Sequence, residues 1–481
     1  MCIWLESDRR NANEMEFVRQ KARLRRRPRD RYAAFCMWLL LLLVISGCAA
    51  GYSRFIGGSL NRLARRDYAG ALEKLEKPSG STNLLLYRLE KGLILHYQGE
   101  WEASNDQFER AERLIDRHVR SVSRELASML TNDAIRPYGG EEHERTLIHY
   151  FRALNYSHLG QLESALVECR KANLRLADHA QASKVELSYL NDAFLQYTTG
   201  LFYEATGEFN DAYISYRDAA KGYAAYADAF GTPTPASMST DLRRTTHNLG
   251  FDTEWDLAQQ QWKLPEGPEV PAPGPGVITV FAESGFVGRK VEQDISIPIT
   301  ERDHHHDAWR VSRRAVYRYH HPVYHGRVKY WLRMALPEWR SRPSRVQGVR
   351  LRVGDTVADG WLVEDIDAIA RRTLEEKMDS ILLRTAARVV TKMLVTKAAE
   401  EENDILGFLV NLFGSGTEAA DTRGWTSLPG AIWMARIEPP PGTGQVALEF
   451  LDAEGRVIDT HVFTDVETSS APVFLNWRSF E

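Results

Sequence analysis

Cysteine is scarce in this chain, and so are the motifs that mark the familiar enzyme classes. Four cysteines occur in 481 residues, at positions 2, 36, 48 and 169. So few cysteines exclude a disulfide-built scaffold, in which a short chain carries many. Phosphate-loop, dinucleotide-binding, nucleophile-elbow and Ser-x-x-Lys signatures are also missing. We therefore predict that the protein is not an enzyme and needs no cofactor.

Histidines cluster in two places, but neither cluster has the spacing of a metal site. His143 and His149 are six residues apart, whereas the zinc-protease helix needs four, so the two lie on different helix faces. Residues 303–307 read Asp-His-His-His-Asp, and neighbouring side chains on a strand point to opposite faces. The alternatives here are a zinc site and a solvated histidine-rich loop. We favour the loop and predict no metal site.

Only one long apolar run occurs, and it lies near the N-terminus. Residues 1–31 are basic, residues 32–45 are apolar, and the run closes with Ile45-Ser46-Gly47-Cys48. This order is typical of a secretory signal peptide. The last four residues resemble the bacterial lipobox, which implies removal of residues 1–47 and acylation of Cys48. Three acyl chains would hold the protein on a bilayer. The alternative is a plain spanning anchor, for which the run is barely long enough.

The residues that would follow cleavage indicate where the protein resides. Ala49 rather than aspartate follows Cys48, which for such lipoproteins implies the outer membrane, and we expect the protein to face the periplasm. Residues 48–58 would form a lipidated tether. Residues 1–47 carry 10 Lys/Arg and 5 Asp/Glu, so removing their +5 from the total of −4 leaves −9. This acidic balance argues against nucleic-acid binding. Cys169 would be the one remaining free thiol, and we expect it in the core.

One template recurs three times, in residues 92–111, 153–172 and 200–219. Each copy starts with a small residue, has glycine seven positions later and ends on alanine, with larger apolar residues between. The glycine suits a tight turn between two helices, and the small residues suit their close approach. The positions that we expect to pack in this way are Gly92, Gly99, Ala111, Ala153, Gly160, Ala172, Gly200, Gly207 and Ala219.

This spacing resembles the tetratricopeptide repeat (TPR), a helix–turn–helix unit. The turn glycines are 61 and then 47 residues apart, against ~34 in the regular repeat, so we expect inserted helices and an irregular solenoid. The predicted fold is mainly α: a TPR-like helical domain at 59–262, followed by a smaller α+β domain with an antiparallel sheet. Glycine and proline crowd residues 263–276, which we interpret as the linker.

The C-terminal domain, residues 277–481, alternates between strand and helix patterns. Residues 277–282 and 289–292 are expected to form a hairpin, and 327–336 and 346–353 two further strands. Residues 365–400 have helical periodicity. Three closing antiparallel strands are expected at 432–437, 445–451 and 457–464.

Two loops hold residues that suit partner binding. Tyr138 lies in the loop 136–142, which would be either a binding lip or ordinary turn chemistry before a helix. Asp421, Arg423 and Trp425 would either anchor a partner or lock a helix-to-strand crossing by an ion pair and a buried ring. We favour the structural reading of both loops.

Several stretches together are similar to a family of bacterial TPR-like lipoproteins. They are the lipobox, residues 90–97 and 149–156, the Asn132-Asp133 and 137–141 loop, and residues 420–429. The resemblance implies cell-envelope residence and a TPR-like fold, and it brings no catalytic residue.

Three hypotheses for function follow. The first is an outer-membrane-anchored interaction scaffold or adaptor that serves cell-wall synthesis or envelope assembly and holds envelope proteins in a solenoid groove. The second places a wall-binding or catalytic module in residues 277–481, with the repeats as a docking arm. The third is a structural spacer without a partner.

Overall fold

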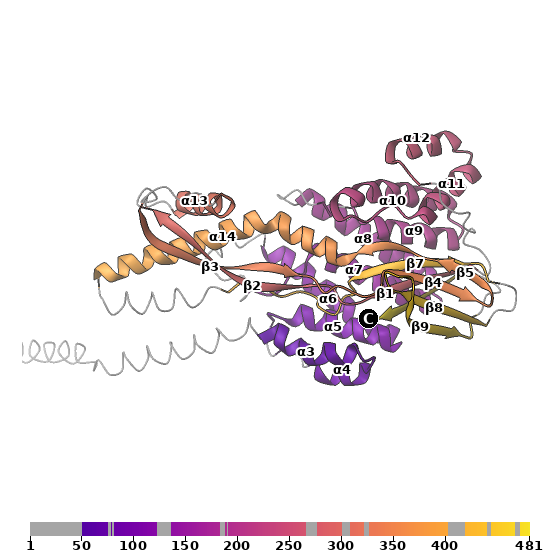
Figure 1. The fold of residues 1–481 in the computed structure, drawn as a ribbon, viewed down its shortest axis with the longest axis horizontal. Coiled ribbons are helices and arrows are strands. Elements are labelled where there is room, and N and C mark those ends of the chain that lie inside the picture. Colours follow the sequence, from indigo (N-terminus) through magenta and orange to yellow (C-terminus); the bar gives the residue numbers. More distant parts are fainter. Residues whose placement is uncertain are drawn as a thin grey trace, which may run out of the picture. The chain divides into compact units, whose positions relative to one another are not determined.

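The computed structural model describes residues 51–75, 78, 81–122, 136–182, 188–189, 191–265, 277–300, 308–321, 327–402, 419–439, 444–466 and 472–481. These residues form twelve helices and ten strands, and the strands lie in the C-terminal part (Figure 1). The predicted signal peptide, Cys48, residues 266–276 of the linker and the 303–307 histidine run lie outside the described residues.

The elements carry the labels of Figure 1. The helices are α3 (Gly51–Leu63), α4 (Tyr68–Lys74), α5 (Leu84–Gln98), α6 (Trp101–Val122), α7 (Glu142–His158), α8 (Leu162–Ala182), α9 (Ala193–Ala205), α10 (Phe209–Phe230), α11 (Ala236–Leu249), α12 (Asp252–Trp262), α13 (Ala308–His320) and α14 (Ile366–Glu402). The strands are β1 (Ile278–Ser284), β2 (Arg289–Thr300), β3 (Val328–Arg340), β4 (Gly348–Val353), β5 (Thr356–Asp359), β6 (Trp361–Asp365), β7 (Ala431–Ile437), β8 (Gln445–Leu451), β9 (Val457–Thr464) and β10 (Val473–Ser479).

The three template stretches each form a pair of packed helices, α5–α6, α7–α8 and α9–α10. Their turn glycines have φ of 84° at Gly99, 71° at Gly160 and 83° at Gly207, a conformation that L side chains rarely adopt. The small residues allow α5 and α6 to approach closely. Gly92 on α5 faces the ring of Phe108 on α6, and the Ser104 hydroxyl donates a hydrogen bond to the backbone carbonyl of Gly92 at 2.7 Å. Among the described residues, the second helix of the first pair, α6, has 22 residues, and that of the second pair, α8, has 21. Their length accounts for part of the wide separation between the turn glycines.

The first helix extends into the region predicted to be a tether. Residues 51–58, predicted to belong to a tether, are part of α3. Ile56 and Leu63, seven residues apart and therefore on one helix face, are 1 % and 0 % exposed in the main core. Burial of these two side chains stabilises the helix and attaches it to the main core.

Strand β1 lies at the centre of the C-terminal part. It pairs in parallel with β10 and antiparallel with β7, in a four-stranded sheet of order β10-β1-β7-β6. A second four-stranded sheet has the order β5-β4-β8-β9, and β2 pairs with β3 alone. The predicted hairpin of residues 277–282 and 289–292 is therefore wrong, because both edges of β1 are taken by strands far along the sequence. The hairpin β8–β9 is present, with Gly455 at φ 76° in its turn.

Both faces of β1 are covered. Ile278, Val280 and Ala282 pack with β4 and β8 in a core between the two sheets. Phe281 points the other way and belongs to the large core that the helix pairs form. The order of layers is therefore helix pairs, first sheet, second sheet, and residues Tyr52–Glu481 form one compact unit. The predicted boundary separates two kinds of secondary structure, but the largest core contains residues from both sides of it.

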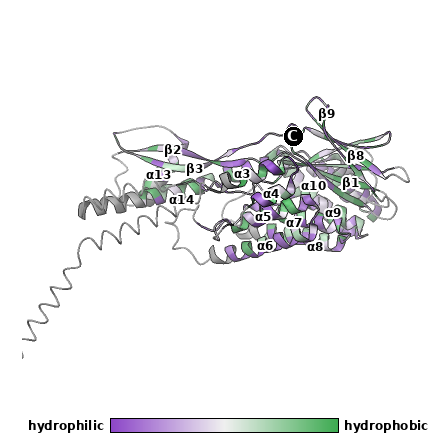
Figure 2. Ribbon diagram, turned by 90° about the horizontal axis from the view of Figure 1, so that it is seen from below, coloured by the Kyte–Doolittle hydropathy of each residue, from purple (hydrophilic) through white to green (hydrophobic). Residues whose placement is uncertain are grey.

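The hairpin β2–β3 and helices α13 and α14 share a third core of their own. It contains Ile297, Val311, Leu332 and Leu382. Figure 2 shows these four elements side by side, at the left of the picture. Helix α13 and strands β5, β6 and β10 were not predicted. No helix in the described ranges combines the length and apolarity needed to cross a membrane.

The close approach within the helix pairs can be tested at Gly200. A Cβ there would lie 2.3 Å from Cε1 of Tyr216, which is fully buried and donates a hydrogen bond to Glu204 at 2.6 Å. We expect Gly200→Ala to lower the free energy of unfolding by about 1–3 kcal/mol, measured by urea denaturation. The control is Gly58→Ala, at an exposed helix position with nothing within 4 Å, which should stabilise by about 0.5–1 kcal/mol. Equal effects of the two substitutions would contradict the packing argument.

Candidate functional site

The four residues singled out for partner binding come together, but they lie inside the molecule. Tyr138, Arg423 and Trp425 are 7 %, 3 % and 1 % exposed. Arg423 makes two hydrogen bonds to the carboxylate of Asp421, at 2.8 and 2.7 Å, and a third to the carbonyl of Arg136 at 2.8 Å. Its guanidinium lies 5.3 Å from the centre of the Tyr138 ring. Burial leaves three of the four unavailable to a partner and supports the structural reading.

The segment that contains Trp425 inserts between the helix pairs. Its ring packs against Phe108 and Phe151, with ring centres 5.7 and 5.9 Å apart. Its backbone N–H donates to Glu144 at 2.7 Å, and the N–H of Thr426 donates to Glu90 at 3.0 Å. Two buried glutamates, one on α5 and one on α7, thus accept hydrogen bonds from backbone N–H groups of a loop that belongs to the C-terminal part.

The loop before α7 is held by turn chemistry. Glu141 and Glu144 form a reciprocal capping box at the helix start. Tyr138 also donates to Glu144, at 2.7 Å. Burial raises the pKa of Glu141, but the charges of Lys290 and Lys377, 2.6 and 2.9 Å away, outweigh it and hold the pKa well below its usual value. This loop is a joint between α7, β2 and α14 rather than an open lip.

A buried carboxylate on β1 links the first sheet to the helices. Glu283 is fully buried and accepts hydrogen bonds from Tyr97 on α5 and, at 3.1 Å, from Tyr150 on α7. Burial raises its pKa to about 7. Arg478 on β10 donates to three carbonyls in this region: Gly285 at 2.6 Å, Ser427 at 2.6 Å and Leu428 at 3.1 Å.

A second buried ion pair joins the third helix pair to the sheet. Arg436 on β7 and Asp241 on α11 are 2.6 Å apart, and both side chains are fully buried. Asp241 also accepts from Tyr197 at 2.8 Å and from Arg244 at 2.5 Å. Removing one partner of such a pair leaves an uncompensated buried charge, so the contact strongly favours this one arrangement of helices and sheet.

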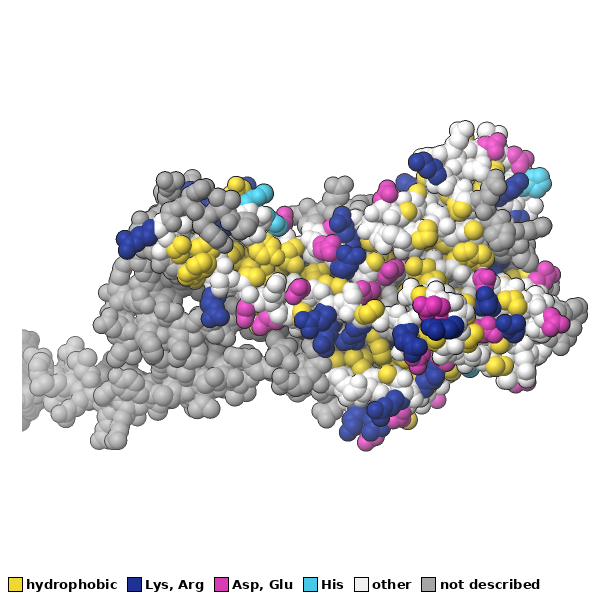
Figure 3. Space-filling model, in the orientation of Figure 1, with side chains coloured by type: hydrophobic (Ala, Val, Ile, Leu, Met, Phe, Trp, Pro, Cys, Tyr) yellow, Lys and Arg dark blue, Asp and Glu magenta, His cyan; other side chains and the backbone are white. Residues whose placement is uncertain are grey.

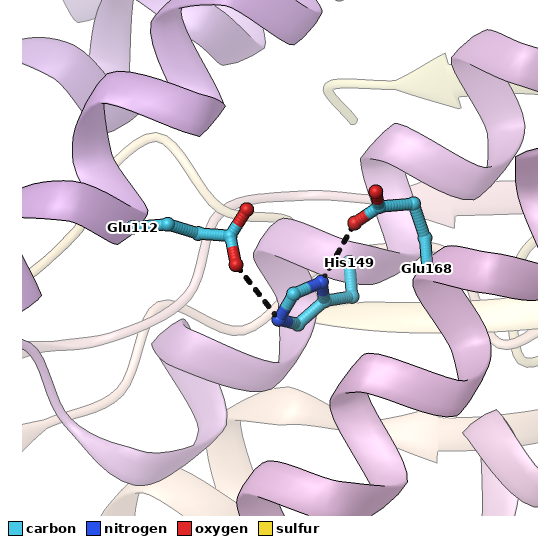
Figure 4. Close-up of side chains that lie close together, drawn as sticks. All are labelled: Glu112, His149 and Glu168. Carbon is cyan, nitrogen blue, oxygen red and sulfur yellow. Dashed lines mark hydrogen bonds and ion pairs between the residues drawn. The ribbon is translucent and has the colours of Figure 1, made fainter. Parts of the chain in front are cut away.

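The residues with metal-ligand geometry are Glu112, His149 and Glu168, from α6, α7 and α8 (Figure 4). His149 Nδ1 lies 2.9 Å from Glu168, and Nε2 lies 3.7 Å from Glu112. Basic side chains already neutralise the carboxylates, since Arg152 contacts both of them and Arg175 pairs with Glu112 at 2.9 Å. A divalent ion would meet these positive charges, so we interpret the cluster as an ion-pair network between three helices.

A small pocket opens where α7, α14, β2 and the 422–426 segment meet. Its cavity volume is about 30 Å³, and Trp339 and Trp425 form part of its wall. His143 and Thr373 also line it, and both are buried. Burial lowers the pKa of His143 to about 4, so this imidazole is neutral at pH 7. Sequence reasoning examined His143 only for metal spacing and did not single out Thr373.

Cys169, the free thiol expected after the predicted cleavage and acylation, lies in the helical core. Cys169 is 0 % exposed, as expected from its position in the template. Burial raises the pKa of its thiol to about 12, so the reactive thiolate does not form at neutral pH.

No family model matches the chain, and no curated protein matches it either.

The structural role of Trp425 gives a first test of this site. We expect Trp425→Ala to lower the free energy of unfolding by about 3–5 kcal/mol, because it removes a buried ring from the junction of helices and sheet. Trp331 on β3 is 57 % exposed and provides the matched control (Figure 3 shows hydrophobic side chains over this strand). Trp331→Ala should change the free energy by no more than about 0.5 kcal/mol in the same urea titration. If Trp425→Ala leaves the free energy of unfolding unchanged, the ring does not stabilise the junction.

Glu283 gives a second test through the pH dependence of stability. Its pKa is about 7 when folded against 4.5 ordinarily, so between these values the folded protein keeps a proton that the unfolded chain has released. The stabilising contribution is complete below pH 4.5 and is lost as the pH rises to 7, by up to about 3 kcal/mol. Glu283→Gln keeps the size of the side chain and one of the two acceptor oxygens that Tyr97 and Tyr150 use, and it has no such proton. The free energy of unfolding of wild type relative to this variant should therefore fall over that pH range, and a constant difference would refute the assignment.

Proposed function

We propose that the protein is a lipid-anchored interaction scaffold of the bacterial cell envelope, attached through Cys48 to the outer membrane and facing the periplasm. The observation that carries the proposal is the set of three packed helix pairs with glycine turns, an arrangement similar to repeat proteins that bind other proteins. The lipobox-like run before Cys48 supports the anchor.

The helical face turned toward β1 is not available to a partner. Phe194 on α9 packs on Phe281 of β1, with ring centres 5.9 Å apart, and Phe202 packs on Phe474 of β10 at 4.7 Å. The face of the helix pairs where we expected a binding groove is thus covered by the chain's own sheet. A protein partner would have to bind elsewhere.

An outward surface of α8 and α10 is better suited. Val167, Leu174 and Phe209 are 44 %, 63 % and 50 % exposed. Arg170, between the first two on α8, lies 3.7 Å from Glu208, the residue before Phe209, so this part of α8 lies next to the start of α10. We call Val167, Leu174 and Phe209 the outer patch and propose it as the partner surface, with arginine at its centre as in many interfaces.

The proposal is tested by cross-linking and affinity capture of the full-length protein from intact envelopes. We expect one discrete envelope protein to be recovered, and recovery to fall about tenfold for Leu174→Asp and for Cys48→Ala. Leu257→Asp is the matched control, because Leu257 is 60 % exposed on α12, outside the outer patch.

Two results would overturn the scaffold. If the same protein is recovered equally with Leu174→Asp, the outer patch is not its surface. If only cell-wall fragments are recovered, residues 277–481 act as a wall-binding module instead.

A further inference from the structure

The pocket between α7 and α14 contains two buried polar atoms without a partner. Nδ1 of His143 and Oγ1 of Thr373 have no hydrogen-bond partner among the described residues. The two residues are 6 % and 2 % exposed, and both line the pocket. Buried polar groups in folded proteins are almost always hydrogen-bonded, so two unpaired atoms around one cavity indicate a place for a polar group from outside.

Two arginines lie at or near this pocket. Arg289 lines it and is exposed to solvent, and Arg342, just after β3, is half-buried. Burial and then the charge of Arg289 lower the pKa of Arg342, whereas the charges of Glu90 and Asp367 act in the opposite direction. An anion between the two guanidinium groups would offset the repulsion between them.

The acidic groups of the pocket, in contrast, are engaged within the protein. Glu141 is held by two lysines, and Glu144 accepts the backbone N–H groups of Trp425 and Glu141, at 2.7 and 3.0 Å. Asp367, beside the pocket, accepts from the N–H of Gly288 at 2.7 Å. A Cβ on Gly288 would lie 2.5 Å from that carboxylate, so only glycine allows this approach.

We propose that the pocket binds a single anionic group, a carboxylate or a phosphate, with Arg289 and Arg342 supplying charge and His143 and Thr373 donating hydrogen bonds. The planar guanidinium matches either oxyanion with two parallel bonds. The small cavity admits the anionic group alone, so the remainder of a larger ligand lies outside it. This binding site depends neither on the lipid anchor nor on the outer patch.

Calorimetric titration of the full-length protein in detergent tests the proposal with three probes. They are inorganic phosphate, trialanine with a free carboxylate, and trialanine with a C-terminal amide. Saturable binding of phosphate or of the free-carboxylate peptide is expected, and which of the two binds identifies the anion. Binding of the amide as tightly as the acid, or no binding of any probe, would overturn the proposal.

Variants assign the binding to the pocket. Arg289→Gln should weaken it about tenfold, because a charge-assisted bond is lost. Thr373→Val should weaken binding while leaving the urea midpoint of the ligand-free protein unchanged, since the hydroxyl has no partner within the described chain. Arg333→Gln, which removes an exposed arginine of β3, is the control. If Arg333→Gln weakens binding as much as Arg289→Gln, or if Arg289→Gln has no effect, the anion does not occupy this pocket.

Discussion

The burial of β1 on both faces is the constraint on which the rest of the structure depends. One face completes the core between the two sheets, and the other completes the core of the helix pairs. Its two edges are occupied by β7 and β10, so no register shift is possible without moving every layer. Glu283 also fixes the position of β1 against the helices, because its buried carboxylate needs the hydrogen bonds that Tyr97 and Tyr150 donate. The helix pairs and the sheets are therefore parts of one folded unit.

The sequence predicted the features that depend on neighbouring residues. A glycine seven positions after a small residue specifies a helix–turn–helix locally, and all three such pairs are present. The closing strands at 432–437, 445–451 and 457–464 were also predicted, because each alternates or is rich in β-branched residues. Strand pairing was not predictable in the same way. β1 pairs with residues 473–479 and 431–437, and nothing in a strand's own composition names so distant a partner.

The candidate site was only partly accessible to sequence reasoning, for a physical reason. Charged residues are usually solvated, so Glu283, Arg436 and Arg478 gave no sign of burial. The one available signal was a glutamate directly after the apolar residues of β1, in a strand whose continuous hydrophobic pattern indicates burial on both faces. Asp421, Arg423 and Trp425 were recognised as unusual, yet spacing alone does not distinguish a residue that anchors a partner from one that anchors its own chain.

The sheet that covers one face of the helix pairs limits how this protein could bind a partner. In a repeat scaffold the inner helices bind a partner in an open groove, whereas here the chain's own sheet fills that position. A partner that displaced the sheet would expose Phe281 and Phe474 and separate Arg436 from Asp241. Breaking one such pair alone costs about 3–5 kcal/mol, so replacement of the sheet by another protein on this face of the helix pairs is strongly disfavoured. The surfaces proposed for recognition are then the outward helices and the pocket at the junction, where a ligand would contact the helix pairs and the C-terminal part at once. Binding at the junction would stabilise the contact between the layers, because it adds interactions available only when both are in place.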